Sequence, residues 1–192
     1  MPIPTLRTER LFLRAFSLAD SPRVRELAGE RDVADTTLNL PHPYEEGIAE
    51  EWIGGLAPAW EARERLTLAI TTESDGLVGA AGLRLVLDHR RAELGYWIGK
   101  PYWDRGFATE ASRAILGYGF DQLDLHRIVA RHFPRNPASG RVMRKLGMAH
   151  EGRLREHVVR WGRFEDLECY AILQPEWRER SAHQQPSSPP ST

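Results

Sequence analysis

Residues 93–111, ELGYWIGKPYWDRGFATEA, constrain the fold most, because they join an aromatic, strand-like run to a helix through a short loop that contains glycine. The first N–H groups of a helix have no partners within the helix and carry partial positive charge, so a phosphate is favoured there. Gly106 lets the backbone come close to such an anion, and Ala108 is nearly as small. The stretch therefore predicts a phosphate-binding loop, although a strand, a tight turn and a helix with one glycine are also ordinary α/β structure.

Other motifs that carry chemistry are absent from the sequence. Neither G-x-x-x-x-G-K-[ST] nor G-x-G-x-x-G occurs, so nucleotide hydrolysis lacks its usual support. The seven histidines form no H-x-x-H or H-E-x-x-H pair and have no cysteine partner, so we expect no metal site. Cys169 stands in the apolar run LECYAIL, which favours core packing over a nucleophilic role.

Length and composition bound the class of protein. A chain of 192 residues suits one α/β domain, which we place at residues 1–180, and the serine, proline and glutamine content predicts a disordered tail at residues 181–192. The net charge of −1 favours neither nucleic acid nor an anionic membrane as a partner. The chain has no signal-like start and no apolar run of membrane-spanning length, so we expect a cytoplasmic protein.

Hydrophobic periodicity predicts a mixed α/β (α+β) fold. Three neighbouring antiparallel strands lead to the loop at Gly106, and a strand, crossover helix and strand of this length imply one parallel pair. The sheet is therefore expected to be mostly antiparallel, with about seven strands and about four flanking helices. Strands are predicted at residues 6–16, 65–72, 77–86, 92–98, 127–133, 154–159 and 167–173, and helices from near residues 21 and 45, at 109–120, and after 137.

Three segments together carry a family resemblance. The run at residues 93–111, followed by RIVARHFPRNPASGRVMRKLGM and EGRLREH, resembles the GNAT-type N-acetyltransferases in their RimJ/RimL-like branch of ribosomal-protein alanine acetyltransferases. The resemblance extends from LRTERLFLRAF to YAILQPEW, almost the whole chain. It implies a GNAT-like fold with a splayed parallel pair, acetyl-CoA as co-substrate, and transfer to a primary amine such as a protein N-terminal α-amino group. It also implies a possible homodimer.

The resemblance assigns the coenzyme contacts. The pantetheine arm is expected along residues 96–98, and backbone amides of residues 103–109 are expected to hold the pyrophosphate. Trp103 stands where family members usually carry glutamine or arginine, a departure of little cost because the contact is mainly through the backbone. The expected coenzyme-binding residues are Tyr96, Trp97, Ile98, Trp103, Asp104, Arg105, Gly106, Phe107, Ala108, Thr109, Asn136, Ser139 and Arg144.

Asn136 and Ser139 have two interpretations. Both are good helix-capping residues at the end of a strand. The resemblance instead implies that Asn136 holds the pantetheine region and that Ser139 contacts the sulfur end. The position of the usual tyrosine proton donor is occupied by Met143, which has no proton to give, and this favours Ser139 as the donor to the departing thiolate.

Acetyl transfer to an amine also requires a neutral nitrogen. An α-amino group has a reference pKa of about 7.7–8.0, so a carboxylate that acts through water is a sufficient base. Glu93 is the leading candidate, with Glu151 and Glu168 as second choices, although a charged residue on a solvent-exposed strand face explains Glu93 equally well. Backbone N–H groups near Trp97 and Ile98, freed where a bulge splits the sheet, are expected to stabilise the oxyanion.

The acceptor and the acyl group stay open. His42, Tyr44 and Trp161 are expected to line the acceptor mouth, while Arg144 is expected to meet the 3′-phosphate. The leading function is acetyl-CoA-dependent N-acetyl transfer by direct attack of the amine. The alternatives are a coenzyme-A-binding module without catalysis, a small-molecule amine as acceptor, and another acyl-CoA as donor.

Overall fold

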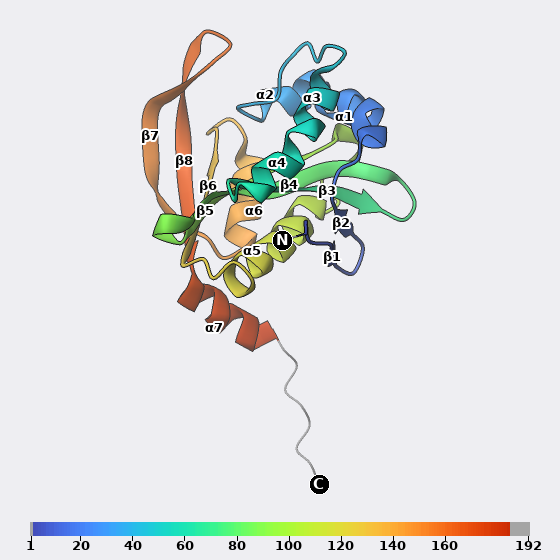
Figure 1. Cartoon of the computed structure of the whole chain (residues 1–192). Coiled ribbons are helices and arrows are strands. Elements are labelled where there is room, and N and C mark those ends of the chain that lie inside the picture. Colours follow the sequence, from blue (N-terminus) through green and yellow to red (C-terminus); the bar gives the residue numbers. More distant parts are fainter. Residues whose placement is uncertain (1, 185–192) are drawn as a thin grey trace.

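The strands form one eight-stranded sheet in the order β1-β2-β3-β4-β5-β6-β8-β7 (Figure 1). Neighbouring strands are antiparallel except β5 and β6, which are parallel. The mixed α/β class with one parallel pair is thus confirmed. The computed structural model describes residues 2–184, with strands β1 (Leu6–Arg7), β2 (Phe12–Arg14), β3 (Arg65–Thr72), β4 (Gly76–Val86), β5 (Arg91–Ile98), β6 (Arg127–His132), β7 (Ala149–Arg160) and β8 (Arg163–Leu173).

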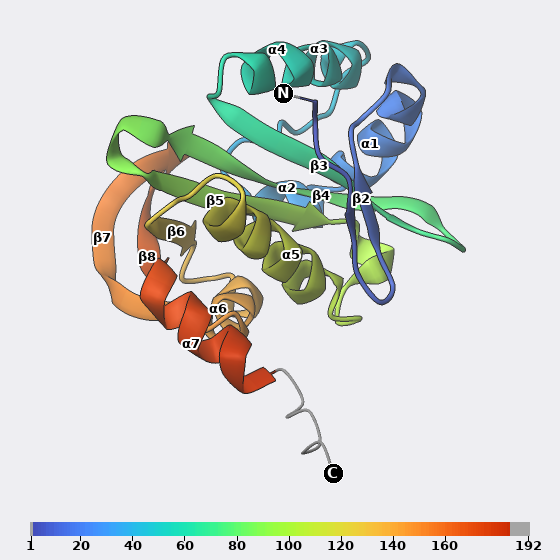
Figure 2. The ribbon, with the colours of Figure 1, turned by 60° about the horizontal axis from the view of Figure 1, so that its bottom comes forward.

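Helices cover both faces of the sheet. In Figure 1, α1, α2 and α3 lie above the sheet and α5, α6 and α7 lie below it, and Figure 2 shows the second group in front of the strands. Side chains that alternate along β5 therefore point to different helical layers. The helices are α1 (Ser21–Ala28), α2 (Arg31–Asp35), α3 (Ile48–Gly54), α4 (Leu56–Glu61), α5 (Phe107–Asp121), α6 (Pro137–Lys145) and α7 (Gln174–Gln184).

Local turns explain where the elements differ from expectation. The strand expected at residues 6–16 is divided into β1 and β2, because Thr8 N–H donates to the Leu11 carbonyl at 3.0 Å and closes a turn. The helix expected from residue 45 is divided at Gly55 into α3 and α4. Helix α2 is not among the helices predicted from the sequence, and α7 continues to Gln184, past the domain end expected at residue 180. Residues 185–192 of the expected tail lie outside the described residues.

The parallel pair separates in the middle of the sheet. β5 and β6 are paired from Arg91 with Arg127 to Leu94 with Ala130, and beyond that point β5 continues unpaired on this side to Ile98. The register between β5 and β4 is uninterrupted up to Ile98. The gap therefore opens because β6 diverges from β5. The prediction of a bulge in β5 near Trp97 is wrong.

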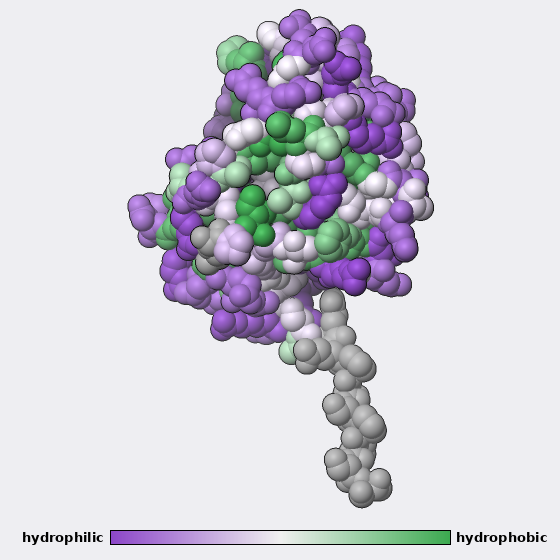
Figure 3. Space-filling view, turned by 45° about the vertical axis from the view of Figure 1, so that its right-hand side comes forward, coloured by the Kyte–Doolittle hydropathy of each residue, from purple (hydrophilic) through white to green (hydrophobic). Residues whose placement is uncertain are grey.

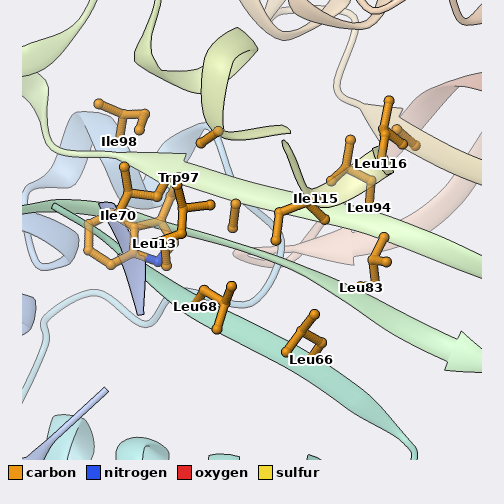
Figure 4. Packing of buried hydrophobic residues seen from close by; sticks show 14 of the residues in the cluster. Leu13, Leu66, Leu68, Ile70, Leu83, Leu94, Trp97, Ile98, Ile115 and Leu116 are labelled. Carbon is orange, nitrogen blue, oxygen red and sulfur yellow. The ribbon is translucent and has the colours of Figure 1, made fainter. Parts of the chain in front are cut away.

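The core holds α5 against the sheet beside this gap. Ile115 and Leu116 of α5 have no exposed surface, and Figure 4 shows them in the cluster with Leu83 of β4 and Leu94 of β5. A Cβ added to Gly119 would lie 2.9 Å from the Ile128 side chain, so the helix approaches the sheet closely here. This packing fixes the start of α5 relative to the end of β5.

The surface is mixed in character. On the face in Figure 3, hydrophobic residues lie among hydrophilic ones. Among the described residues, the exposed large hydrophobic side chains include Phe12 and Leu18. Within residues 2–184, no helix is both long and apolar enough to cross a membrane.

The ion pair between Arg14 and Asp20 gives a stability prediction. Arg14 donates to both Asp20 carboxylate oxygens at 2.8 Å, and Ser17 N–H donates to one of them at 2.8 Å. The Arg14 hydrogen bonds, which outweigh burial, hold the Asp20 pKa below its ordinary 3.8. A lowered folded-state pKa adds stability above the unfolded pKa, and this stability is lost as pH falls through the folded value.

We therefore expect Asp20→Asn to lower the free energy of unfolding at pH 7 by about 1 kcal/mol, after allowance for screening by water. Urea unfolding at pH 7 and near pH 3 measures the effect, which should shrink at the lower pH. Asp124→Asn is the matched control, because its ion pair with Arg90 is largely exposed. Equal losses in the two variants, or a loss independent of pH, would contradict the prediction.

Candidate active site

The loop before α5 is shaped for an anion. Asp104 and Gly106 both have left-handed backbones, with φ of 59° and 81°, and they turn the chain into α5 at Phe107, two residues earlier than expected. No side chain of the described residues caps the helix, so its first N–H groups are available to a ligand. These features fit a pyrophosphate held by backbone donors, as the sequence predicts.

The N-terminal turn fixes this loop in place. Glu110 in the first turn of α5 accepts from Thr8 Oγ1 at 2.6 Å, from Arg10 N–H at 2.9 Å and from Arg10 Nε at 2.7 Å. Arg10 Nη1 also donates to the Arg105 carbonyl at 3.0 Å. Although burial raises the pKa of Glu110, the hydrogen bonds from Thr8 and Arg10 lower it overall. No pattern in the sequence predicts this connection, because it joins residues about a hundred positions apart.

Trp103 covers the end of the β5 edge. Its indole N–H donates to the Ile98 carbonyl at 2.7 Å, while its side chain remains partly exposed. Gly99 N–H bonds to Val78 of β4, so strand alternation directs the backbone groups of Ile98 and Tyr96 toward the gap. This edge offers main-chain donors and acceptors to an extended arm placed in the gap.

Asn136 and Ser139 make different contacts at the start of α6. Asn136 caps α6, because its Oδ1 accepts from Ser139 N–H at 3.2 Å, and its Nδ2 donates to the Thr36 carbonyl at 3.4 Å. The Ser139 hydroxyl instead lies 2.7 Å from Tyr96 Oη. Burial raises the pKa of Tyr96 to about 12. Met143 is buried in the core, so the position of the usual tyrosine does not face solvent.

Glu93 lies on the other face of β5. It alternates with Leu94 and Tyr96, and its pairing with Val129 comes just before β5 and β6 separate. Its carboxylate lies between Arg84 Nη2 at 3.2 Å and Arg131 Nη1 at 3.7 Å, and about a quarter of the side chain is exposed. Glu93 therefore faces the α1–α3 side of the sheet, whereas Ser139 lies on the α6 side.

The second-choice carboxylates are less suited to act as bases. Glu151 is paired with Arg127, which lowers its pKa. Glu168 accepts from His150 at 2.7 Å and from Arg153 Nε at 2.6 Å, and these hydrogen bonds, the first in particular, lower its pKa. A carboxylate with a lowered pKa is a weaker proton acceptor, so these hydrogen bonds count against Glu151 and Glu168 as bases.

The two segments expected at the acceptor mouth meet in the structure. Arg160 Nη2 donates to the carbonyls of Ala34 at 2.8 Å and Leu40 at 2.6 Å, which connects the β7–β8 turn to the loop after α2. The rings of His42 and Trp161 lie 6.4 Å apart. Tyr44 is turned inward, and a Cβ added to Gly29 would lie 3.0 Å from the Tyr44 Cβ.

Arg144 forms a hydrogen bond away from the loop at Gly106. It donates to the Tyr170 hydroxyl at 3.0 Å and lines a hollow of about 590 Å³ beside Glu176 and Arg180 of α7. No cluster of three potential metal ligands occurs within residues 2–184.

The family model for the acetyltransferase (GNAT) domain matches residues 10–149. The chain belongs to the GNAT acetyltransferase family. It is 30% identical to "Uncharacterized N-acetyltransferase p20" of Bacillus licheniformis over 175 residues, which cover 90% of this chain and 98% of that one. A more local match of 32% over 84 residues joins it to the [ribosomal protein uS5]-alanine N-acetyltransferase of Escherichia coli, covering 44% of this chain and 43% of that enzyme.

Solved structures agree with this assignment. A GNAT-family acetyltransferase from Bacillus anthracis superposes with a TM-score of 0.80 at 28% identity, covering 90% of this chain and 99% of that one. A Vibrio cholerae spermidine N-acetyltransferase in complex with CoA and spermine shares the fold, with a TM-score of 0.77 at 24% identity over 89% of this chain and 99% of that one. The protein is thus an acetyl-CoA-dependent N-acetyltransferase.

Proposed function

We propose that this acetyltransferase acetylates protein N-terminal α-amino groups by direct attack in a ternary complex, as a member of the RimJ/RimL-like branch. The observation that carries the mechanism is the gap between β5 and β6, with the Ser139 hydroxyl on one face of β5 and the Glu93 carboxylate on the other. The local match to the uS5-alanine enzyme supports a protein N-terminus as the acceptor.

Separate groups of the site bind the coenzyme and carry out the proton transfers. The uncapped N–H groups at the start of α5 hold the pyrophosphate, and the unpaired edge of β5 holds the pantetheine arm. Acetyl-CoA then supplies the activated acetyl group at the gap. Glu93 removes a proton from the amine through water, and the Ser139 hydroxyl donates to the departing sulfur.

Direct attack by the amine is favoured because Cys169 is poorly suited to form an acetyl-enzyme intermediate. Cys169 is the sole cysteine of the sequence, and burial raises the pKa of its thiol, which lowers the fraction of reactive thiolate at neutral pH. A ternary complex therefore requires no covalent intermediate on the protein.

The charges near the mouth favour a protein N-terminus over a polyamine. Asp35 is paired with Arg135 at 2.9 Å and Asp32 with Lys100 at 2.6 Å, so both acids already have cationic partners. Arg160 and Arg31 both lie against the Trp161 ring. A polycation would meet this positive charge with several charges of its own, whereas an α-amino group carries a single charge, which is lost as the pH rises through about 8.

Release of free thiol from acetyl-CoA, measured with N-terminal peptides and with spermidine as acceptors, tests the proposal. We expect turnover with peptides that begin with alanine or serine and little with spermidine. Preference for spermidine would move the function to small amines, while tight CoA binding without turnover on any amine would favour a module without catalysis. Faster consumption of succinyl-CoA than of acetyl-CoA would change the donor.

Glu93→Gln is expected to reduce kcat/KM for a peptide acceptor by about 10²-fold at pH 7, where the amine is largely protonated, because a general base contributes about 10²–10⁴-fold. The loss should shrink above about pH 8, where the α-amino group is already neutral. A pH–rate profile measures this. A loss that is constant with pH would indicate that Glu93 serves only its arginine partners.

A further inference from the structure

The hydroxyls of Tyr96 and Ser139 meet across the gap. Tyr96 Oη lies 2.7 Å from Ser139 Oγ and 3.3 Å from the Ser139 carbonyl oxygen. The pairing of β5 with β6 ends at Leu94, two residues before Tyr96. This contact therefore connects β5 to the start of α6 at the level where strand pairing has ended.

The chemistry of the two hydroxyls favours Tyr96 as the donor. Each hydroxyl has one hydrogen, so when one donates to the other, the acceptor keeps its own hydrogen for a third group. A phenol is far more acidic than an alkyl alcohol and is the stronger donor. Burial raises the pKa of Tyr96 to about 12, which keeps the phenol protonated throughout the neutral range.

Ser139 is also fixed through its main chain. Its N–H donates to Asn136 Oδ1 at 3.2 Å within the cap of α6. Asn136 thus fixes the backbone of Ser139, while Tyr96 fixes the side-chain oxygen. The Ser139 hydroxyl hydrogen is then left to turn into the gap.

We propose that Tyr96 is a positioning residue, which donates to Ser139 Oγ and directs the Ser139 hydroxyl toward the sulfur of the thioester. This inference rests on the function proposed above. When the C–S bond breaks, its electron pair goes to sulfur, and the Ser139 hydrogen bond stabilises the thiolate until it takes a proton from solvent. A hydroxyl that accepts a hydrogen bond is a stronger donor, because bonds in a chain polarise one another.

Tyr96→Phe tests the role, because it keeps the ring and removes only the hydroxyl. We expect kcat to fall about tenfold, as for the loss of one ordinary hydrogen bond, with the KM for acetyl-CoA and the calorimetric Kd for CoA changed less than about twofold. In the Ser139→Ala background the same change should have no further effect on kcat, because Tyr96 acts through Ser139. Tyr118→Phe, which removes the hydroxyl of another half-buried tyrosine, is the matched control and should leave kcat unchanged.

Three results would overturn the inference: an unchanged kcat in Tyr96→Phe, a loss confined to KM, or losses that multiply in the double variant. Incorporation of 3-fluorotyrosine at position 96 guards against a folding defect, since it retains the hydroxyl and makes it a stronger donor. Here kcat should stay at or above the value of the unaltered protein, and a tenfold loss would contradict the role. If the unaltered protein turns over no amine, both the proposed function and this inference are wrong. If the unaltered protein is active but the Tyr96 variants do not behave as expected, only this inference is wrong.

Discussion

Ser139→Ala is expected to lower kcat for acetyl transfer by about 10²–10³, which is the usual cost of removing a donor that stabilises charge developing in a transition state. The Ser139 hydroxyl belongs to no helix cap, since Asn136 provides that cap, so its loss should not disturb α6. The KM for acetyl-CoA should change little, because we propose that the loop at Gly106 provides most of the binding. Steady-state kinetics with a saturating peptide acceptor measure both constants.

Ser112→Ala is the control for this experiment. Ser112 is fully buried on α5, and its Oγ has no hydrogen-bond partner among the described residues, so its removal should leave activity unchanged. A kcat within about threefold of the unaltered protein in Ser139→Ala would be too small for a donor role. The sulfur would then depart without help from this hydroxyl.

Gly106→Val is expected to weaken CoA binding by about 30–100-fold. The φ of 81° is unfavourable for a β-branched residue, and a Cβ here would lie 3.3 Å from Arg10 Nη2, in the contact that holds the loop. Relief of the strain moves the first N–H groups of α5 away from the pyrophosphate. Strain of this kind costs about 1–3 kcal/mol, and the misplaced donors add to the loss of affinity. Calorimetric titration with CoA measures it.

Gly47→Val separates strain from binding. Gly47 has a similar φ of 88° at the start of α3, and nothing lies within 4 Å of an added Cβ. It should lower thermal stability about as much as Gly106→Val while leaving CoA affinity unchanged. Equal losses of CoA affinity in the two variants would show that Gly106 acts through global stability. The loop at Gly106 would then not be the pyrophosphate-binding site.

Local patterns predicted most of the fold. Strict alternation in RLTLAITT gave β3 over the residues observed, and the strand–helix–strand order around α5 gave the parallel pair. The errors arose where single residues decide the outcome. A hydroxyl at Thr8 divides the first strand, and two adjacent glycines divide the second helix. Such divisions depend on side-chain hydrogen bonds and backbone freedom that periodicity does not measure.

Less of the candidate site than of the fold could be predicted from the sequence. The loop at Gly106 was recognisable because its residues are contiguous, whereas the contact of Tyr96 with Ser139 joins residues 43 positions apart. Alternation does place Tyr96 on the same face as Leu94, which was a usable signal. The arginines around Glu93 come from two neighbouring strands, so their positions follow only from the register of the sheet.

The connection from Thr8 and Arg10 to Glu110 has a practical meaning for work with this enzyme. The segment at residues 8–10 holds in place the loop that we propose as the CoA-binding loop. We therefore expect tags or trimming near residue 8 to change the affinity for CoA, so kinetic constants should be compared only between preparations that share the same first residues.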